Sequence, residues 1–400
     1  MRSVVDLKQK KLLDILRTIQ IHGPVAKPDV AVMANISTVT AHTIMSELEA
    51  AGLIAEAGAS RSNGGRKAAL YRTNPEYGYI IGQNVGRTKI TTSLCDLSLK
   101  TLYIERLKSD LTKANVSIAN MKSEIDKAVK NAGVPKEKIL GVGVTLPGQV
   151  NHQSGVVNGM LNMTGWNDTL LQSIIERSCG LPACVYNDNR ANVVSCKWLD
   201  KIPEAANAVY VNISDGVGVG VMIRGEVFSG SHSLAGELGH IEARGNKTKC
   251  QCGGAGCVET LVCTEHIIRR VKKVYDLSAS GKDSTRAQIN EIIRAAKDGN
   301  AKVYGIIRDA VLDIGFVLDL VIKAYDPEKT IIYSPWLNNF DELFGELTES
   351  VFEKCGWLKK NSMSIERDTD DYIDSYGPVS IVLENLFNYE SENRISLKLE

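Results

Sequence analysis

The residues of this chain whose types and spacing most directly suggest chemistry are His240, Cys250, Cys252 and Cys257, in the pattern H-x9-C-x-C-x4-C. Thiolate and imidazole are ligands that Zn²⁺ prefers, and four of them complete a tetrahedron with no position left for a reactive water. Glycines at 253, 254 and 256 would let the loop close around an ion. The alternative is three unrelated buried thiols beside a histidine, but so dense a cluster in a Gly-rich loop favours a metal site. The sequence therefore predicts one structural zinc per chain.

The remaining cysteines are scattered, and we expect them to be core residues: Cys95, Cys179, Cys184, Cys196, Cys263 and Cys355. A total of nine, with three crowded into one loop, favours reduced thiols and a cytoplasmic protein. The N-terminus lacks the pattern of a signal peptide, and no apolar run approaches the length of a membrane span. No membrane partner is expected.

A second candidate site lies on a helix predicted near the start of the chain. Ser37 is placed to cap this helix and Gly52 to end it. The spacing of Ala41, Ile44 and Leu48 turns these side chains inward. Short side chains on an exposed helix can contact base edges in the major groove of DNA. The outward positions, and hence the predicted DNA-contacting residues of this helix, are Thr38, Val39, Thr40, His42 and Thr43.

Basic residues follow at a Gly-rich tip. Arg61, Arg66 and Lys67 lie beside Asn63-Gly64-Gly65, where a close approach to DNA would let the cations meet phosphates or enter the minor groove. Between residues 28 and 60 there is no Lys or Arg, so we expect affinity to come mainly from this tip and the first helix.

The elements that would position these residues form a small N-terminal domain. Leu12, Leu13, Leu16 and Ile19 share one face of a helix over residues 8–21, which Gly23-Pro24 ends, and a second helix can begin at Pro28. Residues 53–73 read as a hairpin. Three helices and a hairpin predict a winged helix-turn-helix over residues 1–75. The alternative is a small domain for dimerisation or protein contact.

The distribution of charge agrees with DNA binding. Residues 1–75 hold ten Lys and Arg against six Asp and Glu, although the whole chain balances 47 against 47.

The rest of the chain reads as α/β. Residues 79–97 and 208–228 repeat one unit, an apolar strand, a polar Gly-containing turn and a second apolar strand, which suggests two related lobes with a cleft between them. A long helix is expected over 303–325, ended by Asp326-Pro327. The segment from about 389 is polar and reads as a tail or the last turn of a helix.

Several motifs in this body resemble the ROK family of sugar kinases and sugar-responsive repressors. The most specific is GVGVGVMIRGEVFSGSHSLAGELGH at 216–240, followed by CQCGGAGCVE; shorter matches are LPGQV at 146–150, NMTGW at 162–166, YNDNRAN at 186–192 and DPEKTIIYSP at 326–335. The resemblance implies an actin-like ATPase (ribonuclease H-like) fold of two α/β lobes and assembly into homodimers or homotetramers. The first lobe would span 76–193, joined by a C-terminal helix at 376–400. The second would span 194–375 and carry the zinc site and the oligomerisation surface.

The resemblance also implies a pocket for a sugar or sugar phosphate. Carried over position by position, its residues would be Asn162, Asn187, Asp188, Glu237, His240 and Glu259. Carboxylates and amides suit vicinal hydroxyls, and His240 would use one ring nitrogen for zinc and the other for sugar. The alternative for Asn187-Asp188 is a surface turn.

The nucleotide side of such a site is altered. The family's kinases usually carry D-x-G-x-T, where this chain has Asn84-Val85-Gly86-Arg87-Thr88, and G-T-G-x-G-G-G, where it has residues 215–221 beginning Asp215-Gly216-Val217. A strand end that often carries glycines has Ser334-Pro335 instead. We therefore expect a repressor of carbohydrate-utilisation genes that binds operator DNA and is not an enzyme.

Two alternatives stay open. Asp188, the catalytic base of the family's kinases, is retained, so the chain could be an active sugar kinase with an added DNA-binding head. It could also be a regulator that responds to another protein in place of a sugar.

Overall fold

The computed structural model describes residues 4–60, 67–161, 163–203, 206–278, 284–354, 363–370 and 373–388, together with residues 395 and 397. The chain divides into two compact units, Met1–Lys201 with Tyr372–Glu400, and Ile202–Asp371. The structure moves the predicted boundary at residue 193, because this position lies inside the continuous helix α6 (Asp188–Trp198). The N-terminal segment belongs to the first unit, where its first helix packs against α12 (Ile373–Phe387).

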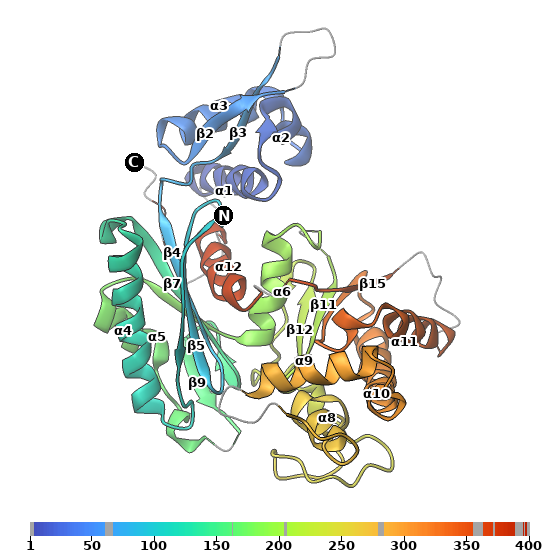
Figure 1. Ribbon diagram of the computed structural model, residues 1–400. Coiled ribbons are helices and arrows are strands. Elements are labelled where there is room, and N and C mark those ends of the chain that lie inside the picture. Colours follow the sequence, from blue (N-terminus) through green and yellow to red (C-terminus); the bar gives the residue numbers. More distant parts are fainter. Residues whose placement is uncertain are drawn as a thin grey trace. The chain divides into compact units, whose positions relative to one another are not determined.

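The N-terminal segment has three helices and a small sheet (Figure 1). Helices α1 (Val4–His22), α2 (Lys27–Met33) and α3 (Thr38–Ala50) accompany strands β1 (Val25–Ala26), β2 (Ile54–Ala59) and β3 (Ala69–Thr73), in the order β1-β3-β2. All pairs are antiparallel. Four residues, 34–37, join α2 to α3.

Local sequence accounts for these elements. The Ser37 hydroxyl accepts the backbone N–H of Thr40 at 3.1 Å and caps α3 as predicted. The helix ends at Ala50, and Gly52 follows with a φ of 71°, in the left-handed region where glycine is favoured. The side chains predicted to face inward are buried: Leu12, Leu13, Leu16, Ile19, Ala41, Ile44 and Leu48.

The body of the first unit is a five-stranded sheet in the order β10-β7-β4-β5-β6. Strands β4 (Tyr79–Val85), β5 (Lys89–Asp96) and β6 (Thr101–Lys108) form an antiparallel meander. Strand β7 (Ile139–Leu146) lies parallel to β4, and β10 (Ala183–Asn187) lies parallel to β7. A separate hairpin pairs β8 (Gln149–Asn151) with β9 (Val156–Gly159).

Helices cover both faces of this sheet. Helices α4 (Ala114–Ala132) and α5 (Leu171–Cys179) lie on one face, and α6 and α12 lie on the other (Figure 1). Glycines on the α12 side allow this helix to approach: a Cβ at Gly143 would lie 1.7 Å from the Pro378 carbonyl oxygen. Helix α12 begins before the predicted residue 376 and runs to Phe387; most of its predicted extension to residue 400 lies outside the described residues.

The second unit repeats this topology. Its sheet has the order β13-β12-β11-β14-β15, with β11 (Ala208–Ile213), β12 (Val217–Ile223) and β13 (Glu226–Val227) antiparallel. Strands β14 (Lys329–Tyr333) and β15 (Ser364–Arg367) continue it in parallel. The repeat predicted from residues 79–97 and 208–228 is confirmed and extends over five strands in each unit.

The helices of the second unit enclose its hydrophobic core. They are α7 (Glu259–Val262), α8 (Thr264–Val271), α9 (Ser284–Lys297), α10 (Ala301–Tyr325) and α11 (Asp341–Lys354). Helix α10 ends as predicted, with Asp326 at a φ of 44°. Short 3-10 helices complete the chain at η1 (Lys136–Lys138), η2 (Thr164–Trp166), η3 (Leu238–His240) and η4 (Leu337–Asn339). Over the part of the chain that the structure describes, no helix is both long and apolar enough to cross a bilayer.

Candidate functional site

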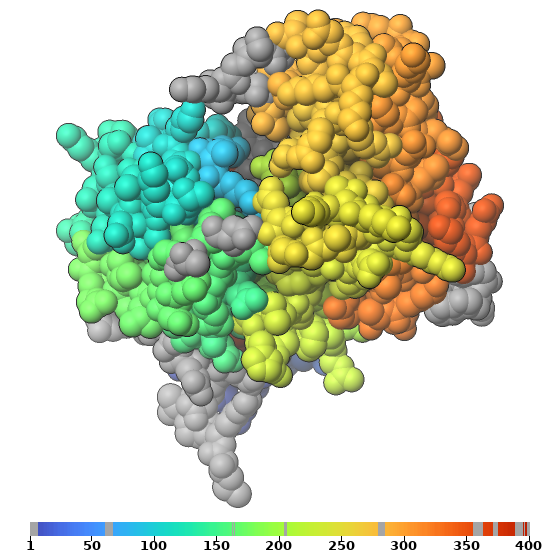
Figure 2. Space-filling view, turned by 90° about the horizontal axis from the view of Figure 1, so that it is seen from below, coloured from blue at the N-terminus to red at the C-terminus, as the bar shows by residue number. Residues whose placement is uncertain are grey.

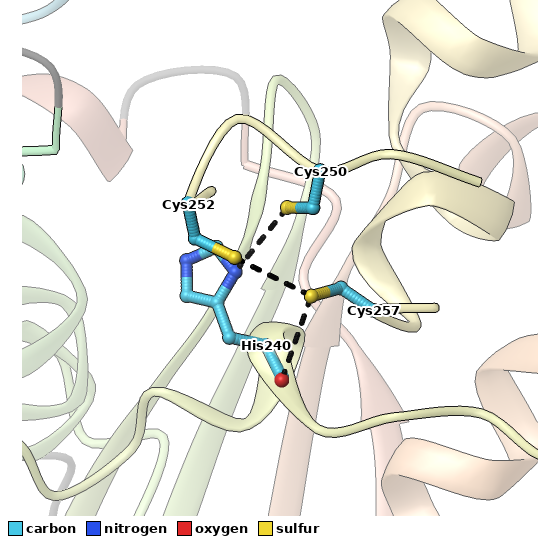
Figure 3. A group of neighbouring side chains, drawn as sticks. All are labelled: His240, Cys250, Cys252 and Cys257. Atoms are coloured by element: carbon cyan, nitrogen blue, oxygen red, sulfur yellow. Dashed lines mark hydrogen bonds between the residues drawn. The ribbon is translucent and has the colours of Figure 1, made fainter. Parts of the chain in front are cut away.

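The four residues predicted to bind metal converge in the second unit (Figure 3). Their ligand atoms all lie within 4.8 Å of one another. The Cys252 and Cys257 sulfurs are 3.5 Å apart, and the Cys250 sulfur is 3.6 Å from Nδ1 of His240. A tetrahedral ion with metal–sulfur bonds of about 2.3 Å and metal–nitrogen bonds of about 2.0 Å sets its ligands about 3.5–3.8 Å apart. The donor set and spacing fit a metal ion and are compatible with zinc.

A tight loop brings the thiols together. Cys250 donates its backbone N–H to the Gly254 carbonyl at 2.9 Å, and Lys249 pairs with Ala255, so residues 249–255 close a small hairpin. Gly256 has a φ of 84°, and a Cβ there would lie 2.8 Å from the Asn246 carbonyl oxygen. The turn therefore requires glycine at 256, and Gly253, with a φ of 92°, also takes the left-handed conformation that favours glycine. The yellow segment that contains this loop reaches the surface in the space-filling view (Figure 2).

Asn246 is a loop residue that sequence reasoning missed. Its side-chain amide donates to the Cys257 carbonyl at 3.1 Å and to the Thr260 hydroxyl at 2.8 Å. It therefore fixes the third thiol relative to the start of α7. No spacing rule indicates such a role, because asparagine is common in loops for many reasons.

The three thiols differ in acidity. Burial raises the pKa of Cys250 and raises that of Cys257 to about 12. The backbone N–H of Gly254 lowers the pKa of Cys252. Cys252 therefore carries negative charge most readily, and the other two require a nearby cation to become thiolates. A bound divalent ion would supply that charge and displace the protons.

The two nitrogens of His240 face different ways. Nδ1 lies toward the Cys250 sulfur, and the second ring nitrogen points away from the three sulfurs (Figure 3). This orientation suits the predicted use of one nitrogen for metal and the other for a ligand. Close packing determines the path of the chain leading to His240, because a Cβ at Gly236 would lie 1.9 Å from the Val219 carbonyl oxygen of β12. Glu237, between them, is half-buried.

In the first unit, Asn187 and Asp188 lie at the junction of β10 and α6. The Asn187 side-chain oxygen accepts the backbone N–H groups of Asn189 and Arg190 at 3.0 and 3.2 Å, and its amide donates to the Gly148 carbonyl at 3.1 Å. Asn187 is buried and caps α6, so this pair is not a surface turn.

Asp188 is the more open member of the pair. It is half-buried, and one carboxylate oxygen accepts the backbone and side-chain N–H groups of Asn189 at 2.8 and 2.9 Å. Asn187 therefore positions the helix, and Asp188 is the better candidate to contact a ligand. Asn162, also predicted to bind sugar, lies outside the described residues.

The LPGQV segment is held against the start of α6. Arg190 is buried and donates from Nη1 to the Val150 carbonyl at 3.1 Å. Gly148 has a φ of 103°, and a Cβ there would lie 2.6 Å from the Gly159 carbonyl oxygen. Arg190 is thus a second positioning residue that sequence reasoning missed, because Asn-Asp-Asn-Arg reads as an ordinary polar helix start.

In the second unit, Glu259 binds the turn where the altered phosphate motif lies. Its Oε2 accepts the backbone N–H of Val217 at 3.1 Å, and a Cβ at Gly216 would lie 2.9 Å from that oxygen. In phosphate-binding turns such N–H groups face the anion. Here a carboxylate accepts one of them, and Asp215 adds a second acidic side chain in the same turn.

The ROK family pattern matches residues 80–358, which is more than half of the chain. The chain belongs to the ROK family. The matched range takes in the loop of His240 and the three cysteines and nearly all of both five-stranded sheets; β15 lies beyond its end.

Among curated relatives, this ROK protein is 26% identical over 358 residues to the xylose repressor of Caldicellulosiruptor bescii, covering 88% of this chain and 89% of that protein. It is 27% identical over 390 residues to the DNA-binding transcriptional dual regulator NagC of Escherichia coli strain K12, covering 96% and 95% of the two chains.

Solved structures confirm the fold. A ROK family transcriptional regulator, described as a homologue of the E. coli MLC protein, matches with a TM-score of 0.75 and 22% identity over 95% of this chain and 96% of that one. A ROK family glucokinase from Streptomyces griseus, in complex with glucose and AMPPNP, matches with a TM-score of 0.62 and 20% identity over 76% and 99%. Regulators and kinases therefore share the α/β body of this ROK protein.

The predicted DNA-contacting residues of α3 lie on its outer side. Thr38, Val39, His42 and Thr43 are exposed and Thr40 is half-buried, as is expected of an outward face. Lys67 is exposed next to β3, and Arg61 and Arg66 lie outside the described residues.

Proposed function

We propose that this ROK protein is a sugar-responsive, DNA-binding transcription regulator, most simply a repressor of carbohydrate-utilisation genes. The observation that carries this is the match to NagC, which covers 96% of the chain. The few unmatched residues are far fewer than the 75 of the N-terminal segment, so the match must include most of that segment. The glucokinase match stops at 76%. A chain that aligns with a regulator along its whole length has the parts of a regulator.

The N-terminal segment would be a winged helix-turn-helix. Helices α2 and α3 with their four-residue turn form the helix-turn-helix, and β2 and β3 form the wing. Helix α3 would enter the major groove, with Lys67, Arg61 and Arg66 of the wing on phosphates or in the minor groove. A homodimer or homotetramer would bind a two-fold symmetric operator.

The body would bind a sugar or sugar phosphate. In the first lobe, residues 76–201 with α12, Asp188 would accept a hydrogen bond from a sugar hydroxyl, and Asn162 and Asn187 would also contribute. In the second lobe, residues 202–371, Glu237, His240 and Glu259 would contribute; this lobe would also carry the oligomerisation surface. Charged acceptors make strong hydrogen bonds and discriminate against ligands that lack the hydroxyl.

Zinc would be a structural ion, one per chain, held by His240, Cys250, Cys252 and Cys257. It would order the loop that ends at α7 and orient the His240 ring through Nδ1. None of the cysteines in the described parts of the chain forms a disulfide, which suits a cytoplasmic protein.

ATP would not be used. The Val217 N–H is already bonded to the Glu259 carboxylate, and Asp215 would repel a phosphate placed at this turn. The retained Asp188, half-exposed at the start of α6, favours the second candidate, an active sugar kinase with a DNA-binding head. A coupled assay for ADP release, run with each monosaccharide that stabilises the protein in a thermal-shift screen, separates the two.

The screen itself tests the sugar response. Monosaccharides and their phosphates at about 100 times Kd should raise the free energy of unfolding by about 2.7 kcal/mol. The same ligands should change the affinity for operator DNA. A protein that responds to none of them, yet binds operator, would be a regulator that senses something other than a sugar.

A further inference from the structure

The second residue of α3 is an exposed valine. Val39 has 78% of its surface exposed and Val32, near the end of α2, has 81%, although valine is usually buried. Met33 beside it is 53% exposed. The helix-turn-helix thus presents apolar side chains at the N-terminal end of α3, where recognition helices meet base edges.

The polar groups of this face are partly committed to the helix itself. The Thr43 hydroxyl donates to the Val39 carbonyl at 3.0 Å, and the hydroxyls of Thr40 and Ser37 are hydrogen-bonded to each other at 2.8 Å. The other group of a threonine side chain is a methyl. The outer face therefore offers methyl groups as much as hydrogen-bonding groups.

The basic residues of this segment do not provide a side chain of α3 that could recognise a base. There is no Lys or Arg from residue 28 to residue 60, so α3 has no side chain that can bind guanine in a bidentate manner. Two lysines from neighbouring elements lie against α3, but they pair with its glutamates: Lys8 with Glu47 at 2.9 Å and Lys27 with Glu49 at 3.8 Å.

Among the four bases, thymine alone carries an apolar group in the major groove, its C5 methyl. We propose that Val39 determines sequence specificity by packing against a thymine methyl in each operator half-site. The inference rests on the proposed DNA-binding function and specifies its chemistry. Affinity would come mainly from phosphate contacts, and Val39 would add an apolar contribution to sequence preference beside the contact expected of His42.

The test begins with duplexes that the full-length protein selects from a random library. In a selected duplex, each thymine is replaced in turn by deoxyuridine, which keeps every hydrogen-bonding group and removes the methyl alone. We expect one thymine per half-site at which the substitution weakens binding about four-fold, the effect of one buried methyl. Replacing that thymine with cytosine should weaken binding further, and 5-methylcytosine should recover part of the loss.

The protein side uses Val39→Ala. This variant should bind the selected duplex more weakly and should no longer distinguish thymine from deoxyuridine at that position. Val116→Ala, an equal change at an exposed valine of α4, should bind like the unaltered protein.

Each outcome is decisive. If no duplex is selected, the proposed DNA-binding function fails. If duplexes are selected but no deoxyuridine substitution weakens binding, the inference is overturned and DNA binding stands. An effect that persists unchanged in Val39→Ala also overturns it, because the methyl would then act through DNA shape.

Discussion

Arg17 of α1 donates a hydrogen bond of 3.0 Å from its guanidinium to the carbonyl oxygen of Phe387, the last residue of α12. The guanidinium also lies 6.0 Å from the centre of the Trp198 ring, at the end of α6. Trp198 donates its indole N–H to Glu384 of α12 at 3.0 Å, and the buried Lys197 pairs with the same carboxylate at 2.6 Å. Through Arg17, the N-terminal segment thus contacts the C-terminal ends of α6 and α12.

Through this contact, both ends of α6 would take part in the proposed function. It begins at Asp188, the best candidate of the first unit for sugar binding, and it ends at Trp198, beneath Arg17. The helix dipole favours a cation at the C-terminal end of a helix. A small shift of α6 or α12 would therefore change the strength of the interactions that Arg17 makes with the ends of these helices.

We predict that Arg17→Ala separates sugar binding from DNA release. Losing the bond to Phe387 should weaken the contact by about 1–2 kcal/mol. Operator and sugar should each still bind, but sugar should change operator affinity much less than in the unaltered protein. Fluorescence anisotropy with labelled operator, with and without sugar, measures this. Arg177→Ala, an equal change on α5, is the control; a full sugar response in Arg17→Ala would show that this contact carries no coupling.

The metal prediction concerns the four-ligand cluster. Protein purified without chelator should contain one zinc per chain, and Cys257→Ser should lose it, because a serine hydroxyl does not replace a thiolate at neutral pH. The second unit should then unfold at a lower temperature, since metal binding energy contributes to its folding. Cys179→Ser, at a buried thiol of α5, should keep its zinc. Elemental analysis that finds no zinc in the unaltered protein rules out the assignment.

Local sequence was enough to predict some of these parts. The cap of α3 at Ser37, its inward Ala41 and Ile44, and the cluster within residues 240–257 all depend on neighbours along the chain, where spacing translates directly into geometry. The first strand pair of each sheet, within residues 79–97 and 208–228, could be predicted for the same reason.

Other features depend on residues far apart. Arg17 and Phe387 are 370 positions apart, and Glu259 meets Val217 across 42. No spacing along the sequence predicts either contact, because only tertiary packing brings the two residues together. The boundary predicted at residue 193 was misplaced for a related reason: α6 continues to Trp198, held by its contacts with α12.

In the N-terminal segment, we expect the wing to contribute affinity for any duplex and α3 to contribute sequence preference. Lys67→Glu should weaken binding to all duplexes alike and lower the slope of log affinity against log salt by about one, because it removes a phosphate contact. His42→Ala should instead change which sequences are preferred. Lys302→Glu, the same charge reversal on α10, is the control. Selection experiments and salt titrations on the variants check both, and operator binding that survives deletion of residues 1–75 would refute the assignment.

The sharpest prediction is that the protein binds sugar without phosphorylating it. Asp188→Asn keeps an oxygen that can accept the N–H groups of Asn189, so α6 should still begin normally. It loses the charged acceptor for a sugar hydroxyl, and sugar affinity should fall by about 2 kcal/mol or more, roughly thirty-fold. Operator binding should persist and no longer respond to sugar, because a ligand shifts an equilibrium only through its different affinities for the two states.

Calorimetry with the sugar and, separately, with Mg-ATP tests both halves of this claim. Sugar should bind and Mg-ATP should not, since Glu259 already accepts the Val217 N–H at the turn where a phosphate would bind. Asp126→Asn, an exposed carboxylate on α4, should match the unaltered protein in every assay and controls for the loss of charge. ADP release at about 1–10³ per second, the range of ordinary enzymes, would instead make Asp188 a catalytic base and the chain a kinase, whatever DNA its N-terminal segment binds.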